Sequence, residues 1–553
     1  MIRVIARRVL VLSFVTLVCC GFASAGSSGS DSKATSDDPV LRAMQEEMQR
    51  SKPLKLEGVA SPDYIDYRLV DTDQYTAEAA FGSVRLAVRQ RVCMLRIVVR
   101  IGNYKQDSYF GAGEGNLEIG PLDGDVVTLR HQLWLGTDKA YKAAAEALTA
   151  KQAQLKKYNV DQPVDDFTPA PPVQSIEPLA RLEVAPEPWL KLLEDASGLY
   201  VKDPQVESFN AGLRFAVTNR YFVSSEGAIG RSGNSSYQLH VTGHTQAADG
   251  MGLDRSRGYE FRAVKELPSS ENFLAQASQL LLTLKQLREA PVTDEEYRGP
   301  VLFSGDAAAS VIASLVGPNI LGKRPQLGQN GRTIGAWATN YKSRVLPDFL
   351  SVEDDPTIST IDGNPLFGDY KVDDEGVPAS RVAVIEKGQL LNYLLGREPI
   401  RDLPVSNGHG RAAANAPPSP ALGNLIVQSS DPLPDDQLKK KLIELCKQRD
   451  LPYGYLVETL APHLTPRLLY RISAKDGHEE LVRGAVFGDL DIRALRNSIV
   501  AAGKDTTVET HLEPIPHSIA SPALLFDELE VKRANTSKQK LPEYPPPAVT
   551  ASK

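Results

Sequence analysis

The C-terminal half of the chain begins with the stretch RGPVLFSGDAAASVIASLVGP, residues 298–318. Residues 301–303 form a short apolar run, and the alanine-rich segment after them predicts a helix over residues 306–316. Gly317-Pro318 should end this helix, because glycine terminates helices and proline cannot continue one. Beyond it, short apolar runs are separated by Gly, Pro, Asn and Asp, and one further helix is predicted over residues 435–447. The stretch therefore opens a large β-rich domain.

Upstream, the patterns predict both helices and strands. Asp38 should cap a helix that ends at Lys52-Pro53. Residues 64–101 are rich in β-branched residues and alternate between apolar and polar, which predicts several antiparallel strands. Residues 137–158 predict a helix with Thr137 as its N-cap. Five arginines of the strand region are expected on the solvated face of a sheet: Arg85, Arg89, Arg91, Arg96 and Arg100.

Prolines and acidic residues fill residues 159–180, which predicts a semi-rigid linker or a long excursion. A short helix is expected over residues 188–197 and a longer one over residues 272–290. Between them, residues 210–265 alternate again and predict more antiparallel sheet. Two hairpin turns are expected there, at Glu226-Gly227 and Gly233-Asn234.

These patterns predict an α+β chain with a smaller α+β N-terminal domain and a large β-rich C-terminal domain. The expected divisions are a signal peptide (1–25), a flexible lead-in (26–37), an N-terminal α+β domain (38–158), a Pro-rich linker (159–180), a middle β-rich and helical region (181–297), the C-terminal domain (298–535) and a disordered tail (536–553).

The N-terminus has the pattern of an export signal. Arg3, Arg7 and Arg8 precede an apolar run over residues 9–23, and Ala23-Ser24-Ala25 offers the small residues that a signal peptidase recognises. We therefore expect cleavage before Gly26 and a location in the periplasm or outside the cell. An uncleaved membrane anchor is the alternative, although the run is shorter than the roughly 20 residues that span a bilayer. No membrane span is expected after cleavage.

The amino-acid composition excludes some classes of function. The 553 residues contain 62 Lys and Arg against 69 Asp and Glu, a net charge of -7, so binding to nucleic acid is not expected. Two of the four cysteines lie in the signal segment. The other two, Cys93 and Cys446, are expected to remain buried thiols, because they are far apart in the sequence and could form one bridge at most.

The sequence contains few of the general motifs that identify a catalytic site. The sequence contains no nucleophile elbow, no phosphate-binding loop and no pair of histidines in a zinc helix motif. The glycine-rich residues 111–115 predict a hairpin. His240 and His244 stand on a predicted strand, where a shared metal ion is not expected. The acidic runs at residues 353–355 and 373–375 could form calcium or acid-base sites, but such runs are more often solvated turns.

From Tyr297 onward the chain resembles the TldD/PmbA family, known as metallopeptidase-related proteins and modulators of DNA gyrase. The resemblance rests on segments in a fixed order: YRGPVL (297–302), VDDEGVP (372–378), VIEKGQL (384–390), GHGR (408–411), GNL (423–425), Gln437-Leu438 and SPALL (521–525). It implies the two-domain architecture above. It also implies pairing between an active TldD-type subunit and a metal-free PmbA-type (TldE-type) subunit.

In the active subunit of this family, His-Glu-x-x-x-His lies on the helix after the G-P-V-L strand, and a later cysteine is the third metal ligand. Here the matching positions are Ala313, Ser314 and Pro318, and no cysteine follows Cys446. Neither Ala nor Pro can bind zinc, and Ser314 cannot act as a carboxylate base. The comparison therefore implies no metal, no cofactor and no catalytic residue of the family type in this chain.

Three hypotheses follow. The first is an exported, catalytically silent PmbA-like subunit or scaffold of a peptidase assembly, which forms a homodimer or a heterodimer with a TldD-type metallopeptidase through residues 300–530. The second is an active metallopeptidase or other hydrolase with a rebuilt site. The third is a peptide- or glycan-binding envelope protein. The residues expected to line the cleft, with a peptide as the possible substrate, are Asp373, Asp374, Glu375, His409, Arg411 and Asn424.

Overall fold

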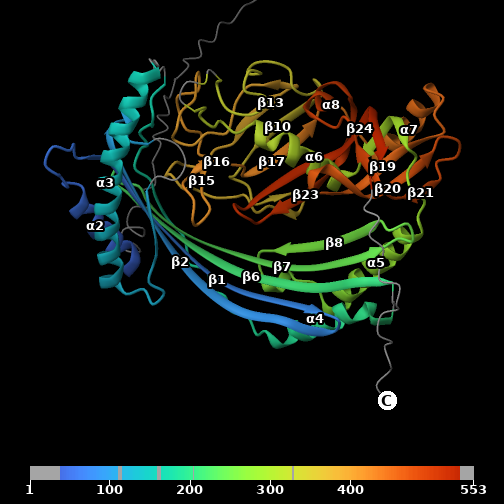
Figure 1. The fold of residues 1–553 in the computed structure, drawn as a ribbon, viewed down its shortest axis with the longest axis horizontal. Coiled ribbons are helices and arrows are strands. Elements are labelled where there is room, and N and C mark those ends of the chain that lie inside the picture. Colours follow the sequence, from blue (N-terminus) through green and yellow to red (C-terminus); the bar gives the residue numbers. More distant parts are fainter. Residues whose placement is uncertain are drawn as a thin grey trace, which may run out of the picture.

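A computed structural model describes residues 38–109, 115–158, 164–202, 205–326, 329 and 331–535. The expected signal peptide, lead-in and C-terminal tail lie outside the described residues, as does most of the glycine-rich segment 111–115. Two large sheets organise the described chain, one of eight strands and one of twelve (Figure 1). The twelve-stranded sheet belongs to the C-terminal domain, so the predicted α+β class with a large β-rich C-terminal part is confirmed.

The eight-stranded sheet is built mainly from long antiparallel strands. Its strands are β1 (Pro62–Ala80), β2 (Ser83–Asn103), β3 (Gln106–Asp107), β4 (Asn116–Ile119), β5 (Gln174–Ile176), β6 (Val206–Ser224), β7 (Ile229–Gln246) and β8 (Gly252–Phe261). Residues 64–101 thus form two long strands rather than several. The Glu226-Gly227 turn is confirmed, but Gly233-Asn234 lies inside β7 and is not a turn. Because β1 pairs with β6, residues 38–158 and 181–297 share one sheet.

Alternation along these strands gives the sheet two different faces. Odd-numbered residues such as Tyr67, Phe215 and Leu239 are buried in cores beneath helices. Even-numbered residues at the same levels are polar: Thr72, Thr218 and Asn234 stand in one row across β1, β6 and β7. Figure 1 shows the strands curving beneath the C-terminal domain, with α4 and α5 on the opposite side of the sheet. The polar face is therefore turned toward the C-terminal domain.

Four helices cover the apolar face: α2 (Pro39–Ser51), α3 (Val126–Tyr158), α4 (Glu187–Gly198) and α5 (Ser270–Glu289). Asp38 caps α2 as predicted, since its carboxylate accepts hydrogen bonds from the backbone N–H groups of Val40 and Leu41. The predicted first residue of α3 was wrong. The helix begins at Val126, and Thr137 lies inside it with its hydroxyl donating to the carbonyl of Leu133. Hydroxyls use this i−4 acceptor within helices, so Thr137 gave a false N-cap signal.

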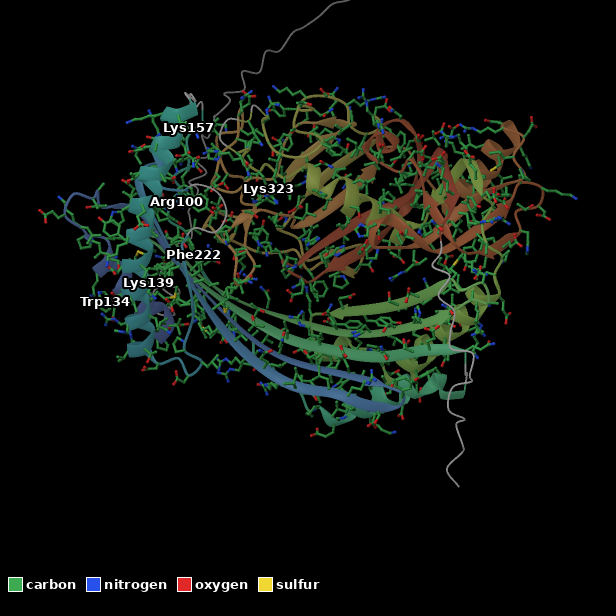
Figure 2. All side chains as sticks on the ribbon, in the orientation of Figure 1. Arg100, Trp134, Lys139, Lys157, Phe222 and Lys323 are labelled. Carbon is green, nitrogen blue, oxygen red and sulfur yellow. The ribbon has the colours of Figure 1, made fainter. Side chains whose placement is uncertain are left out.

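The arginines of β2 divide into two groups. Arg89 and Arg91 are exposed as predicted, but Arg96 and Arg100 are only 5% and 6% exposed. Arg100 lies 2.7 Å from Asp107 and stacks on Phe167. The prediction failed for Arg96 and Arg100 because this end of the sheet is covered on both faces. In Figure 2, Trp134 on α3 points away from the molecule, whereas Phe222 lies where the sheet meets the C-terminal domain.

The Pro-rich segment is fastened to both parts of the molecule. Asp166 lies 2.6 Å from Lys151 of α3 and 2.7 Å from Arg324 of the C-terminal domain. The backbone N–H of Thr168 donates to the carbonyl of Arg397. The described part of this segment therefore contacts both parts of the molecule, and residues 174–176 within it pair with β7 as β5.

The C-terminal sheet has β9 (Glu296–Phe303) at its centre, between β24 (His517–Arg533) and β19 (Tyr453–Ala461). Its other strands are β10 (Leu350–Asp354), β13 (Val382–Glu386), β14 (Gln389–Leu390), β17 (Asn424–Ser429), β18 (Pro432–Leu433), β20 (Thr465–Ser473), β21 (Glu479–Val482), β22 (Ala485–Phe487) and β23 (Ile499–His511). Two small hairpins lie outside this sheet, β11 (Thr360–Ile361) with β12 (Asn364–Pro365) and β15 (Gly410–Arg411) with β16 (Ser419–Pro420).

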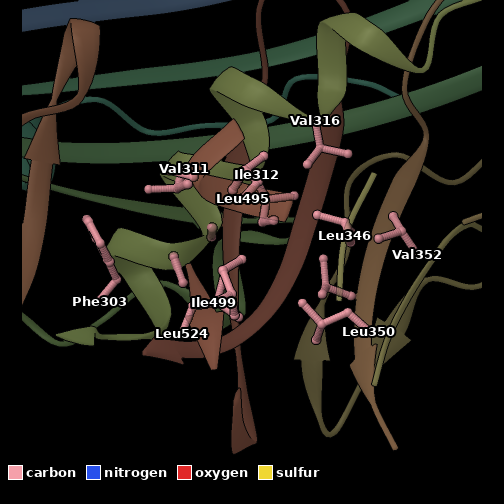
Figure 3. Close-up of a cluster of buried hydrophobic side chains, with 14 of the residues drawn as sticks. Phe303, Val311, Ile312, Val316, Leu346, Leu350, Val352, Leu495, Ile499 and Leu524 are labelled. Carbon is pink, nitrogen blue, oxygen red and sulfur yellow. The ribbon is translucent and has the colours of Figure 1, made fainter. Parts of the chain in front are cut away.

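Helix α6 (Gly305–Leu315) follows β9 as predicted. Its Val311 and Ile312 are fully buried, and Figure 3 shows them packed beside Leu495 and Ile499. The predicted helix near residues 435–447 is α7 (Asp435–Gln448). The sequence did not reveal α8 (Ile492–Asn497), because six residues are too few for a helical period to stand out.

Cys93 and Cys446 are buried free thiols, as predicted. Burial raises the pKa of Cys93 to about 12 and that of Cys446 to about 11. Among the described residues, no helix is both long and apolar enough to cross a bilayer.

Candidate functional site

Helix α6 presents one polar face to the eight-stranded sheet. Asp306 and Ser310, four residues apart and hence on one face, line a cavity of about 270 Å³ between α6 and β8. The Ser310 hydroxyl donates to Glu509 on β23 over 2.9 Å. The other residues that line this cavity are Arg255, Ser256, Gly258, Glu260, Thr459, Leu460, Arg467, Val508 and Thr510. We call this space the α6 cavity.

Acidic groups of the α6 cavity are held in an environment that disfavours their charge. Burial raises the pKa of Asp306, and the nearby charge of Glu509 raises it further. Burial also raises the pKa of Glu260. His511 lies 3.2 Å from Glu509, and the hydrogen bond to that carboxylate raises the pKa of the imidazole. Protons are therefore held more tightly here than in water.

The positions expected to match the family's metal motif lie at the end of α6 and just beyond it, because Pro318 follows the last helical residue, Leu315. Ala313 packs against the hydrophobic core, while Ser314 and Pro318 are exposed. A zinc ion needs nitrogen, sulfur or carboxylate donors, and none of these three side chains offers one. The residues present at this position of α6 therefore do not fit the metal that the family resemblance implies. Within the described part of the chain, no group of three or more His, Cys, Asp and Glu side chains is arranged to hold a metal ion.

The six predicted cleft residues do lie in one region, but as a buried network rather than an open cleft. Asp373 and Glu375 are 5% and 8% exposed, and His409 and Asn424 are fully buried. The expectation that residues 373–375 form a solvated turn was wrong. The same holds for Asp354 and Asp355 in the run 353–355, both of which are buried. The reason is that backbone N–H groups and arginines satisfy these carboxylates.

Asp373 accepts three backbone hydrogen bonds, from Glu375, Val377 and Gly410. Glu375 accepts one from the backbone N–H of Arg397 over 2.6 Å. Burial raises the pKa of Asp373 well above its usual range, and the neighbouring Glu375 charge raises it further. Burial likewise raises the pKa of Glu375. This pair braces loops of the C-terminal domain.

His409 and Asn424 have bracing roles too. The two ring nitrogens of His409 face the backbone carbonyl of Asn407, at 2.9 Å, and Asp354, at 3.2 Å. Asn424 donates to the carbonyls of Asp355 and Ile358 and accepts from Gly368. Because all these polar groups point at other protein atoms, neither side chain is available to a substrate.

Asp373, Asp374 and Arg411 line a small cavity of about 70 Å³, and Arg411 also lines a larger one. A cavity of about 290 Å³ lies where β1, β6 and β7 face the C-terminal domain, and four arginines line it: Arg214, Arg220, Arg262 and Arg411. We call it the arginine cavity. Sequence reasoning missed Arg214, Arg220 and Arg262. The signal was present, because Arg214, Thr218 and Arg220 alternate with the apolar Phe215, Val217 and Tyr221 on β6.

The two histidines of β7 have different surroundings. His240 packs over Gly212, where a side chain would collide with its ring, and burial lowers its pKa. His244 lies 2.7 Å from Asp254 and 3.1 Å from Glu207. They therefore do not share a ligand.

Comparison with known proteins places the C-terminal domain. Residues 296–533 match the family described as "PmbA/TldA metallopeptidase C-terminal domain". A metalloprotease from Methanocaldococcus jannaschii is 26% identical over 238 residues, which cover 41% of this chain and 48% of that protein. The chain thus matches about half the length of this relative.

Solved structures share the fold of nearly the whole chain. A candidate modulator of a DNA gyrase from Thermotoga maritima superimposes with a TM-score of 0.61 at 14% identity, covering 89% of this chain and 99% of that one. TldE from Thermococcus kodakarensis superimposes with a TM-score of 0.58 at 14% identity, covering 88% and 99%. The resemblance predicted from the ordered motifs is confirmed.

Proposed function

We propose that this chain, a metallopeptidase-related protein of the TldD/PmbA family, is an exported and catalytically silent PmbA-like subunit that binds peptide segments and completes the chamber of a TldD-type partner. One observation carries the proposal. At the end of α6 and just beyond it, Ala313, Ser314 and Pro318 stand at the positions expected to match the family's metal motif, and these side chains cannot bind zinc.

The polar cavities support a binding role. The α6 cavity and the arginine cavity both lie between the two sheets, and ion pairs such as Arg324–Asp166 hold the two parts of the molecule together. A chain without reactive groups would therefore still offer a preformed surface to a peptide. A rebuilt hydrolase is less well supported, because Asp373, Glu375 and His409 are engaged by other protein groups. A peptide- or glycan-binding envelope protein that acts alone is the second candidate, and the arginine cavity favours it.

Light scattering separates the two candidates. We expect the mature chain to form a dimer, with itself or with an exported TldD-type protein from the same organism, through an interface of at least about 1,200–2,000 Å² within residues 300–530. Peptides should be cleaved only when the partner with His-Glu-x-x-x-His is present. A monomer in both samples would remove the partner role and leave the binding protein.

Export is tested on the chain as the cell makes it. With Arg3, Arg7 and Arg8 before a short apolar run, mass spectrometry should find Gly26 as the N-terminal residue of protein recovered outside the cytoplasm. An intact N-terminus on cytoplasmic protein would overturn this part of the proposal.

A further inference from the structure

The arginine cavity has an excess of positive charge. Four arginines line it, against the two carboxylates Asp369 and Glu513, and a third carboxylate, Asp374, lies beside Arg220 and Arg411, so one positive charge remains in excess. Both lining carboxylates already have partners, since Glu513 lies 2.6 Å from Arg214 and Asp369 accepts from Arg262. Glu513 is 61% exposed at its side chain, so solvent weakens its hold on Arg214.

The other two arginines compete for one carboxylate. Arg220 and Arg411 lie 3.5 Å and 3.4 Å from Asp374, which is the acid nearest to both. The Nη1 atom of Arg411 is buried and has no hydrogen-bond partner among the described residues. A buried donor without an acceptor is unfavourable by about 1–3 kcal/mol. Within the described residues, the guanidinium of Arg411 is therefore incompletely satisfied.

The electrostatics of these groups point the same way. Burial opposes the charge of Asp374, yet the positive charges of Arg220, Arg411 and Arg68 outweigh it and hold the pKa of Asp374 below its usual value. Burial lowers the pKa of Arg220, Asp374 opposes this shift, and the like charges of Arg411 and Arg68 lower the pKa further. Asp374 therefore neutralises the neighbouring arginines only in part.

Neutral donors complete the lining. Thr72, Thr218 and Asn234 stand in one row across β1, β6 and β7 and face the same space. Hydroxyl and amide groups of this kind bind the oxygens of an anion or of a peptide backbone. The volume of about 290 Å³ exceeds by far the roughly 10–15 Å³ needed for one water molecule. The space is therefore large enough for a ligand bigger than a single small anion.

We propose that the arginine cavity binds a carboxylate of a peptide, either the C-terminal carboxylate or an Asp or Glu side chain. Guanidinium groups suit this ligand, because their paired N–H groups match the two carboxylate oxygens. The inference deepens the proposed function, on which it rests for the peptide, while the preference for an anion rests on the cavity alone.

Isothermal titration of the mature protein tests the site with three acetylated peptides of one neutral sequence: one with a free C-terminus, one amidated, and one amidated with a glutamate. The carboxylate-bearing peptides should bind at least about tenfold more tightly than the neutral one, which corresponds to about 1.4 kcal/mol. Inorganic phosphate should compete with them. Equal affinity for all three peptides would overturn the site, and binding of phosphate without competition by any peptide would overturn the peptide as its carrier.

Variants of different residues in the arginine cavity should change the affinity for carboxylate-bearing peptides in opposite directions. Arg214→Gln and Arg262→Gln should weaken carboxylate binding about tenfold and leave the amidated peptide unaffected. Glu513→Gln should tighten it, because it removes a competing carboxylate, and this gain cannot arise from damage to the fold. Arg493→Gln, an exposed arginine on α8, is the matched control and should change nothing. Unchanged affinity in both cavity arginine variants would contradict the proposal. If the chain alone cleaved peptides, the proposed lack of catalytic activity would be refuted. The comparison of carboxylate-bearing and amidated peptides would still test the arginine cavity.

Discussion

Asp373 and Glu375 are two buried acids placed side by side, and both have raised pKa values. A carboxyl group whose pKa is higher in the folded than in the unfolded chain binds a proton on folding. Its stabilising contribution is fully present below the unfolded pKa, near 4, and is lost as the pH rises through the folded pKa. The chain should therefore lose stability from these two groups as the pH rises toward neutrality.

The variant Glu375→Gln removes one charge of this pair. Ionisation of Asp373 then becomes easier, so the variant should gain about 1–2 kcal/mol of unfolding free energy relative to the wild type between about pH 4 and pH 8. Urea titrations at several pH values measure this difference. Glu386→Gln, on an exposed side chain, is the control and should keep a constant offset. A difference between Glu375→Gln and the wild type that stays constant over this range would contradict the account.

Arg397 is a single side chain that joins the two halves. It is 1% exposed, donates two hydrogen bonds to the carbonyl of Thr168, and lies 2.8 Å from Glu226 in the turn after β6. Its guanidinium also stacks on Phe167 at 4.0 Å. Removing one member of a buried ion pair leaves the other without a partner.

We expect Arg397→Met to lower the free energy of unfolding by about 3–5 kcal/mol. Arg401→Met, at an exposed position four residues away, should change it by less than about 0.5 kcal/mol. Urea unfolding followed by circular dichroism gives both values. Equal effects of the two variants would show that Arg397 does not join the halves.

At the scale of elements, α6 separates a structural face from a solvent-facing one. Ile312 is fully buried beneath the C-terminal sheet, whereas Ser314 is exposed at a position of the family's metal motif. Ile312→Ala should therefore cost about 2–5 kcal/mol of stability. Ser314→Ala should cost less than about 0.5 kcal/mol, because it removes no contact. Thermal unfolding compares them, and a large loss from Ser314→Ala would mean that this face of α6 has a partner within the fold.

The elements could be predicted where a local period was strong. Helix α6 and the cap of α2 at Asp38 followed directly from residue spacing. The start of α3 did not, because Thr137 has the residue type of an N-cap but bonds back to Leu133 inside the helix. Gly233-Asn234 also misled, since tertiary pairing holds both residues in β7. The dipeptide alone does not show that the chain turns earlier, at Glu226-Gly227, so that Gly233 and Asn234 pair with Asn219 and Thr218 of β6.

The site was harder to predict than the fold. The ordered motifs brought Asp373, His409 and Arg411 together correctly, but they could not reveal that most of this set is buried. Burial depends on how the two sheets face each other, which no local pattern contains. The alternation on β6 marked Arg214 as part of a polar face, but not what that face meets; Arg262, just after β8, reaches the arginine cavity from the same part of the molecule.

At the scale of the whole molecule, thiol reactivity tests whether the cysteines are buried, and the number of thiols tests whether the N-terminal segment is removed. Cys93 and Cys446 are buried, and burial raises both thiol pKa values, so neither should react with Ellman's reagent in the native protein. Under denaturing conditions the mature chain should show two thiols, since Cys19 and Cys20 leave with residues 1–25. Four thiols would mean that the N-terminal segment is retained.

The central claim is that a metallopeptidase-related fold has lost its metal. Zinc content of the purified mature chain, measured by mass spectrometry after incubation with zinc and dialysis, tests this claim most directly. Because the expected match puts Ala313 and Pro318 at the family's histidine positions, the account predicts zinc well below one equivalent and a melting temperature unaffected by chelators. One equivalent of zinc, together with a lower melting temperature after chelation, would contradict it.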